Sequence, residues 1–254
     1  MIESTAILER VRRINADYQS LELAVTEPAF LSMKPGQSLL ARAIDKNPEI
    51  EYWDPYLREQ WWRSGTTTDD NLLRVERPAH LVYEPGQLFS LMGPVGQPYR
   101  FRRNLRNVLL VAYNTEPTPL VIMAPLLKKN GINTTLVLLG IAREYDTAHL
   151  PAEIEIIRGD DKLEWDNKVM TLGWADQIFV VVGHGDELQR FAEVAAMIRD
   201  KRHDVPAAVL FGVFQPILPC GTGACAACTV RTKDGLKLTC VDGPAFDLMS
   251  VKLP

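Results

Sequence analysis

The sequence predicts a β-barrel followed by an α/β domain with a doubly wound parallel sheet, and a C-terminal loop with a hairpin. Three observations support this fold class. Short strand-like segments separated by turn residues fill roughly the first 100 positions, and buried strands alternate with helices from Asn107 onward. All four cysteines lie within the last 35 residues. We therefore expect a barrel domain at residues 1–103, an α/β domain at 104–214 and a cysteine-containing tail at 215–254.

The barrel prediction depends on four short segments with strand-like composition, at residues 22–25, 38–43, 72–75 and 88–92. Pro-Gly-Gln triplets at 35–37 and 85–87 supply turns just before two of these segments. Short strands separated by such turns are typical of a small antiparallel barrel.

The stretch at residues 47–70 contains Trp53, Trp61 and Trp62, which are three of the five tryptophans. Its hydrophobic residues follow no regular period, so we expect a loop rather than a core strand. Large aromatic side chains in a loop usually cover something. A hydrophobic plug and a contact with another subunit are both compatible with this stretch.

The α/β prediction depends on an alternation of apolar strands and amphipathic helices. Strands are expected at 108–112, 134–139, 154–157, 178–182 and 207–214. Helices are expected at 120–129, where Asn130-Gly131 provides a C-terminal stop, and at 186–199. Continuous apolar strands separated by helices indicate a parallel sheet covered on both faces, as in a doubly wound nucleotide-type half.

The tail carries a cysteine pattern typical of metal binding. Cys220, Cys225 and Cys228 follow a C-x4-C-x2-C spacing, and Cys240 follows after eleven intervening residues. The Asp234-Gly235 pair predicts a hairpin that brings Cys240 back to the loop. This is the plant-type spacing for a 2Fe-2S cluster, with a shorter last interval. A zinc site, which usually has two C-x2-C pairs, and unreactive buried thiols are the alternatives.

The net charge, the N-terminal segment and the length of the apolar runs indicate where the protein is expected to act. A formal net charge of −4 argues against nucleic acid, because phosphate recognition needs a basic face. The N-terminus shows no basic segment followed by an apolar one, and the apolar runs are far shorter than the about 20 residues that span a bilayer. We therefore expect a cytoplasmic protein without membrane contact, in which the thiols stay reduced rather than form disulfides.

The tail as a whole resembles a known family. The run from Cys220 to Cys228, the turn at 231–235, Cys240 and the segment Val-Asp-Gly-Pro-Ala-Phe-Asp at 241–247 are similar to the C-terminus of the electron-transfer subunit of class B dihydroorotate dehydrogenase. That family has the ferredoxin reductase-like fold. The resemblance implies a flavin-binding barrel, a nicotinamide-dinucleotide domain and a 2Fe-2S loop. It also implies a hetero-oligomer, in which electrons pass between NADH, FAD, the cluster and a catalytic partner subunit.

The flavin signature of that family is altered in this sequence. The family's Arg-Pro-Phe-Ser run, whose arginine binds pyrophosphate, aligns with residues 59–62. Glu59 therefore takes the place of that arginine, and Arg58 comes one position earlier. A carboxylate repels pyrophosphate unless a cation intervenes. Arg58 could supply that charge, Trp61 could stack on the flavin ring, and the Gly-Pro-Val-Gly run that begins at Gly93 is retained. The sequence thus leaves FAD binding open.

The nicotinamide signature is altered further. The family has a glycine-rich loop after the first strand, because glycine lets backbone amides approach phosphates. Residues 112–120 contain no glycine here, two prolines remove amide donors, and Glu116 adds negative charge. Asn114, Thr115 and Glu116 would instead cap the following helix. His184 replaces the proline of the family's Cys-Gly-Pro turn. The sequence therefore argues against NAD binding.

These patterns together predict an iron-sulfur electron-transfer subunit that passes electrons through Cys220, Cys225, Cys228 and Cys240 to or from a protein partner. Whether the chain has enzymatic activity of its own is left open. A complete FAD- and NADH-dependent reductase with diverged motifs is one alternative, and a non-redox scaffold with a zinc site is the other. Among the histidines only His184, at a strand end, is a candidate functional residue.

Overall fold

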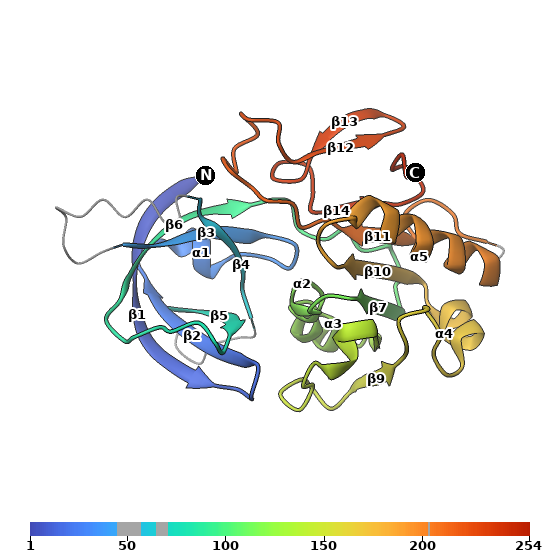
Figure 1. Cartoon of the computed structure of the whole chain (residues 1–254), viewed down its shortest axis with the longest axis horizontal. Coiled ribbons are helices and arrows are strands. Elements are labelled where there is room, and N and C mark those ends of the chain that lie inside the picture. The colour runs from blue at the N-terminus through green and yellow to red at the C-terminus, as the bar shows by residue number, and fades with distance from the viewer. Residues whose placement is uncertain (45–56, 65–70, 203) are drawn as a thin grey trace.

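The structure, a computed structural model, describes residues 1–44, 57–64, 71–202 and 204–254. It consists of an antiparallel barrel, a parallel-sheet domain and a C-terminal hairpin that lies beside both (Figure 1). Trp53 and most of the stretch around it lie outside the described residues. No helix in the described part of the chain is long and apolar enough to cross a membrane.

The barrel consists of six antiparallel strands in the spatial order β4-β3-β6-β1-β2-β5. A short helix, α1 (Pro28–Leu31), follows the second strand. The edge strands β4 and β5 approach each other through an Arg63–Val75 bridge, and the Ser64 N–H donates to the Arg74 carbonyl at 2.8 Å. The barrel is therefore nearly closed, as predicted. Its strands are β1 (Ile2–Arg13), β2 (Tyr18–Val25), β3 (Ser38–Ile44), β4 (Glu59–Trp62), β5 (Leu72–Pro78) and β6 (Leu88–Val95).

Two barrel strands were not predicted from the sequence. β1 pairs with both β2 and β6, although most of its twelve residues are exposed. Its many charged residues hide the strand pattern, because only Ala6 and Leu8 are buried in the barrel. β4 lies inside the stretch predicted as a loop. Trp61 and Trp62 are both buried there, so the loop prediction is wrong for residues 59–62.

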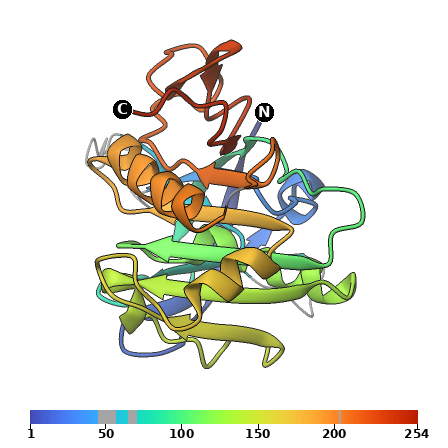
Figure 2. The same ribbon diagram turned by 90° about the vertical axis from the view of Figure 1, so that its right-hand side faces the viewer.

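The second domain has a six-stranded sheet in the order β14-β11-β10-β7-β8-β9. All strands except β14 run parallel, and the order reverses between β7 and β10, as expected for a doubly wound sheet. Figure 2 shows the strands side by side in the sheet, with the C-terminal hairpin beyond the β14 edge. The strands are β7 (Asn107–Tyr113), β8 (Asn133–Leu139), β9 (Ile154–Arg158), β10 (Gln177–Val182), β11 (Leu210–Val213) and β14 (Ala245–Asp247).

Helices cover both faces of this sheet, each over its own apolar cluster. On one face α2 (Thr118–Val121) packs on β10 and α3 (Ala124–Lys129) packs on β8. On the other face α4 (Lys168–Trp174) and α5 (Glu187–Lys201) pack on β7 and β10. The single helix expected at 120–129 is split in two, with Pro125 in the first turn of α3, where its missing N–H is tolerated.

The tail forms a hairpin and then joins the sheet. β12 (Thr229–Thr232) pairs with β13 (Gly235–Leu238), so the two-residue turn is Lys233-Asp234, one position earlier than predicted. Gly235 adopts a φ of +115°, which favours glycine over other residues. β14 then adds an antiparallel strand to β11. The assignment of 1–103, 104–214 and 215–254 as separate domains stays a prediction.

Candidate metal centre and interdomain cleft

Hairpin register brings two of the four cysteines together. Cys228 directly precedes β12 and Cys240 lies two residues after β13, so pairing of the strands places them side by side. Their Sγ atoms are 3.4 Å apart and both residues are buried. The Thr239 N–H donates to the Cys228 carbonyl at 3.0 Å, and the Thr239 hydroxyl donates to the same oxygen at 3.1 Å. These contacts hold the ends of the hairpin in place.

Cys220 and Cys225 form a second pair on the preceding loop. The backbone N–H groups of Cys225 and Thr222 point to the Cys220 sulfur and lower the pKa of this thiol well below its ordinary value. Burial and the neighbouring Cys228 thiol raise the pKa of Cys240, while the Gly223 N–H acts in the opposite direction. Cys225 is exposed, and all four thiols are free. Backbone donors therefore reach sulfur in both pairs.

The loop lies directly against the barrel. Cys228 and Cys240 share an apolar cluster with Leu40, Val95 and Leu218. A side chain at Gly221 would come within 2.7 Å of a Leu40 methyl carbon, and the φ of +64° at this position also favours glycine. The site thus lies at the junction between the barrel and the hairpin (Figure 1).

Hydrogen bonds from the end of β6 fix the segment that follows Cys240. The Gly96 N–H donates to the Cys240 carbonyl at 3.0 Å. The Gln97 side-chain amide donates to the Val241 carbonyl at 2.9 Å. The hairpin is therefore held on the barrel by backbone and side-chain bonds as well as by apolar packing.

The donor set and its arrangement fit a 2Fe-2S cluster. Four cysteine thiolates are the ligand set of such a centre. In the described part of the chain no three His, Cys, Asp or Glu side chains are placed to share one metal ion. Zinc sites usually have two C-x2-C pairs, whereas the first pair here is separated by four residues, as in plant-type 2Fe-2S proteins. The residues present therefore fit a 2Fe-2S cluster.

The three residues predicted to contact flavin lie in different places. Arg58 precedes β4, forms an ion pair with Glu3 and donates to the Ser90 hydroxyl at 2.9 Å. Trp61 is 2% exposed and packs in the barrel against Tyr83 and Phe89.

Gly93, the third of these residues, lies in β6 and faces the barrel interior. A side chain there would meet Leu39 at 3.2 Å and Phe30 at 3.4 Å. The structure thus brings Arg58 to the interdomain cleft but places Trp61 and Gly93 in the barrel core.

Strand β4 presents a different tryptophan to the second domain. Arg58, Gln60 and Trp62 line a cleft of about 600 Å³, because alternate residues of a strand share one face. Sequence reasoning missed Trp62, which the period-two alternation starting at Arg58 would have identified. Glu59 points to the other face, where it pairs with Arg77 and accepts a hydrogen bond from the Trp61 Nε1–H at 3.0 Å. The charge of Glu59 is therefore compensated.

The α/β domain lines the same cleft with the segment after β10 and the segment after β11. The first includes His184 and Glu187, and the second runs from Gln215 to Leu218. Burial raises the pKa of Glu187 to about 7, and this carboxylate accepts a hydrogen bond from the Gln215 N–H at 2.7 Å. Leu218 lines the cleft and also packs on Cys228, so the cleft and the cysteine site adjoin.

The carboxyl end of β7, where a dinucleotide loop would begin, is filled by the chain itself. Asn114 has a φ of +55°, and its side-chain oxygen accepts a hydrogen bond from the Ile141 N–H at 3.2 Å. Ile141 belongs to the short 3-10 helix η1 (Gly140–Glu144). The Asn114 carbonyl oxygen lies 2.5 Å from the position of a Cβ at Gly183. The space at the switch point is therefore occupied by Asn114.

The predicted capping of the next helix is wrong. The N-cap of α2 is Pro117, and no side chain caps this helix. Asn114, Thr115 and Glu116 therefore precede the helix, and the Glu116 carboxylate lies close enough to the Tyr18 hydroxyl of the barrel to interact with it electrostatically. Glu116 thus links the two domains.

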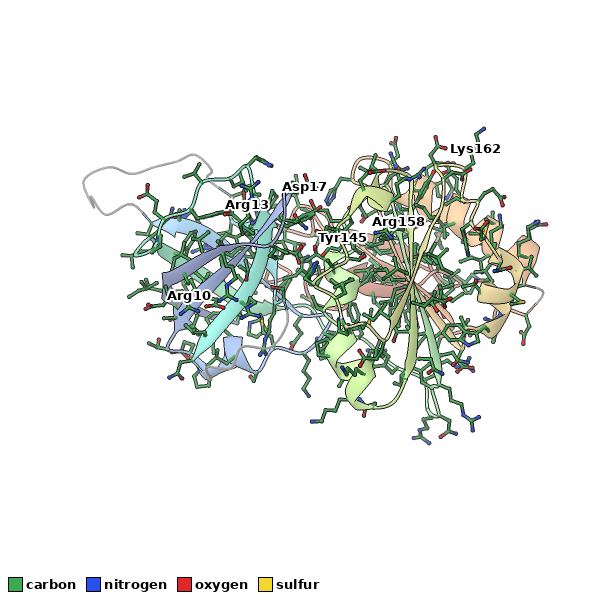
Figure 3. The ribbon with its side chains drawn as sticks, turned by 90° about the horizontal axis from the view of Figure 1, so that it is seen from below. Arg10, Arg13, Asp17, Tyr145, Arg158 and Lys162 are labelled. Atoms are coloured by element: carbon green, nitrogen blue, oxygen red, sulfur yellow. The ribbon has the colours of Figure 1, made fainter. Side chains whose placement is uncertain are left out.

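An acidic cavity of about 410 Å³ lies beside that link, lined by Asp17, Glu116 and Glu144. Figure 3 shows Asp17 and Tyr145 near each other where the two domains meet. The Tyr145 hydroxyl donates to a buried Glu76 carboxylate at 3.0 Å. Burial raises the pKa of Glu76 to about 7, and the Glu116 charge adds to this effect, whereas the Tyr145 hydrogen bond opposes it. Negative charge therefore concentrates at this part of the domain junction.

Comparison with known proteins first defines the class. The chain aligns with a solved NADH-dependent reduced ferredoxin-NADP oxidoreductase at 21% identity and a TM-score of 0.68, covering 98% of this chain and 90% of the other. It aligns with phthalate dioxygenase reductase at 12% identity and a TM-score of 0.58, covering 91% and 87%. The fold is therefore ferredoxin reductase-like, as the resemblance of the tail implied.

Sequence comparison then identifies the relatives. Residues 215–252 match the family model described as the iron-sulfur cluster binding domain of dihydroorotate dehydrogenase B. The chain is 26% identical to the dihydroorotate dehydrogenase B electron transfer subunit homolog of Thermotoga maritima, over 95% of this chain and 86% of the relative. It is 24% identical to the electron transfer subunit of Clostridium perfringens, over 66% and 68%. The predicted resemblance to these subunits is confirmed.

Proposed function

We propose that this chain is the iron-sulfur electron-transfer subunit of an oxidoreductase complex, similar to that of dihydroorotate dehydrogenase B. The observation that carries the proposal is the pairing of four free cysteines in the segment that matches the cluster-binding family. Cys220, Cys225, Cys228 and Cys240 are the proposed ligands. A 2Fe-2S cluster held there would supply one-electron transfer.

The residues around the proposed ligands would stabilise the thiolates and exclude water. Backbone N–H groups of Thr222, Gly223 and Cys225 donate to sulfur and so stabilise the thiolate form. Leu40 and Val95 exclude water from the inner pair, Cys228 and Cys240. Cys225 lies at the surface, where a docked protein can approach closely.

We also propose that FAD, if bound, occupies the cleft between β4 and the segments after β10 and β11. Arg58 is the proposed pyrophosphate partner, since it lines the cleft and its Nε has no hydrogen-bond partner among the described residues. Trp62 replaces Trp61 as the proposed flavin contact. Leu218 connects this cleft to the cysteine site, which supports electron exchange between the two.

We propose that NADH does not bind at the carboxyl edge of the sheet and therefore does not supply electrons from that site. Asn114 fills the place where a phosphate would enter, and Glu116 and Glu144 make the adjacent cavity acidic. Pyrophosphate would be repelled by these carboxylates. A protein partner, either a catalytic subunit or another redox protein, is the proposed source or acceptor, and the relatives' description as electron transfer subunits supports a hetero-oligomer.

The test is elemental and cofactor analysis of the protein purified without oxygen. We expect two iron atoms and two acid-labile sulfides per chain on this proposal. Stoichiometric zinc without sulfide would contradict it. Flavin fluorescence after denaturation tests separately whether FAD is bound. Bleaching of the visible absorbance by NADH alone would contradict the proposed loss of the nicotinamide site.

A further inference from the structure

A separate cavity of about 270 Å³ lies where the barrel meets helices α2 and α3. Met33 and Pro35 of the barrel form one apolar wall, and Ile122 and Leu126 of the helical segment form the other. None of these residues lines the cleft beside β4 or packs on the cysteines. The cavity is therefore a distinct site shared by both domains.

Positive charge gathers at this cavity. Lys34, Arg63 and Lys129 line it, and no aspartate or glutamate is among the described lining residues. Within the described part of the chain none of the three cations forms an ion pair, although the protein as a whole carries a net charge of −4. Unpaired cations beside apolar walls attract anions.

The orientation of Arg63 is fixed by the barrel. Its guanidinium donates to the carbonyl oxygens of Leu31 and Met33, so the side chain is held at the cavity rather than extended into solvent. Lys34 and Lys129 approach from the two domains. Lys128, next to Lys129, instead pairs with Glu153 at 2.6 Å and does not line the cavity.

We propose that this cavity binds an amphipathic anion, meaning a carboxylate or phosphate group on a short hydrocarbon or aromatic body. The apolar walls bury the body, and the three cations receive the charged group. Because the walls come from both domains, the bound anion stabilises their relative arrangement. The site is independent of the cluster and of any flavin in the cleft.

Isothermal titration calorimetry on the full-length protein tests this proposal with octanoate, octyl phosphate and octylammonium. We expect at least one of the two anions to bind with a Kd below about 1 mM, a modest affinity for a ligand of this size. The better of the two identifies the charged group. Octylammonium carries the same hydrocarbon with the opposite charge, and we expect it to give no measurable binding.

Charge-reversal variants locate the site. Lys129→Glu and, as a second variant, Lys34→Glu should each weaken anion binding about 10-fold. Lys128→Glu makes the same change in net charge one residue away and should alter the Kd less than about 2-fold. Equal binding of octylammonium, equal effects of Lys128→Glu and Lys129→Glu, or no heat from either anion up to about 10 mM would overturn the proposal.

Discussion

The cysteine loop and the carboxyl edge of the parallel sheet are both turns beside buried strands, yet their backbones are used in opposite ways. In the cysteine loop, N–H groups of Thr222, Gly223 and Cys225 point to sulfur. At the sheet edge, Asn114 fills the turn and bonds to the neighbouring segment. In the first region backbone donors face free thiols, and in the second the turn packs against a neighbouring segment of the chain. The contrast shows that two turns in one fold can leave their N–H groups facing thiols or be filled by a side chain of the turn itself.

The largest expected effect is at the cysteine loop. Cys228→Ser removes one of the buried proposed ligands, so we expect the iron content and the visible absorbance to be lost, while far-ultraviolet circular dichroism keeps the signal of the sheet. Ala227→Ser is the matched control, since Ala227 is exposed in the same loop. Retained iron in the Cys228 variant, or collapse of the whole fold, would contradict a local metal site.

A smaller effect is expected at the sheet edge. Gly183→Ala places a Cβ 2.5 Å from the Asn114 carbonyl oxygen, so we expect the free energy of unfolding to fall by about 2 kcal/mol through overpacking. Gly173→Ala in helix α4 meets nothing within 4 Å and should leave stability unchanged or slightly raised. Urea denaturation measures both variants. An unchanged midpoint for Gly183→Ala would show that the edge is open rather than packed.

The acidic part of the junction predicts a pH dependence. Burial raises the pKa of Glu76 to about 7 in the folded state, from an ordinary value of 4.5. The unfolded chain therefore releases this proton first, and the stability associated with it is lost as pH rises from about 4.5 through 7.

Glu76→Gln keeps an oxygen that can accept from Tyr145 and removes the charge. We expect this variant to raise the free energy of unfolding by about 1–2 kcal/mol at pH 8 and to change it little at pH 5. Glu9→Gln, on the exposed side of β1, serves as the control. Equal effects at both pH values would show that Glu76 is not protonated in the folded protein.

The smallest expected effect is that of NADH itself. On the proposal that Asn114 and Glu116 leave no room for a dinucleotide, millimolar NADH should shift the midpoint of thermal unfolding by less than about 1 °C. Differential scanning fluorimetry with NADPH and with AMP as parallel ligands provides the comparison. A clear rise in the unfolding midpoint with NADH would contradict the proposal that the sheet edge does not bind a dinucleotide.

Long apolar strands and short turn motifs were predictable because their signals are local. Every strand predicted in the α/β domain is present, with ends shifted by a few residues, and the tail hairpin is present one position earlier than expected. β1 was missed because a strand that pairs on both sides and faces solvent along most of its length shows little hydrophobic pattern. β4 was missed because it has only four residues, too few for their alternation to stand out from the irregular stretch around them.

The choice between neighbouring side chains needed the tertiary structure. Trp61 and Trp62 are adjacent in sequence, and strand alternation sends Trp61 into the barrel core and Trp62 to the cleft. Glu59 looked repulsive from its position alone, but Arg77 from another strand compensates its charge. Such contacts join residues far apart in the chain, so no local pattern reports them.

By itself, the sequence determined the cysteine spacing, the order of barrel and sheet, and the absence of glycine in the loop after β7, because all three depend only on residue type and separation along the chain. The tertiary structure alone decided how the four thiols pair, which face of β4 meets the second domain, and where Lys34, Arg63 and Lys129 converge. Those outcomes depend on strand register and domain packing, which are set by the sum of many distant contacts.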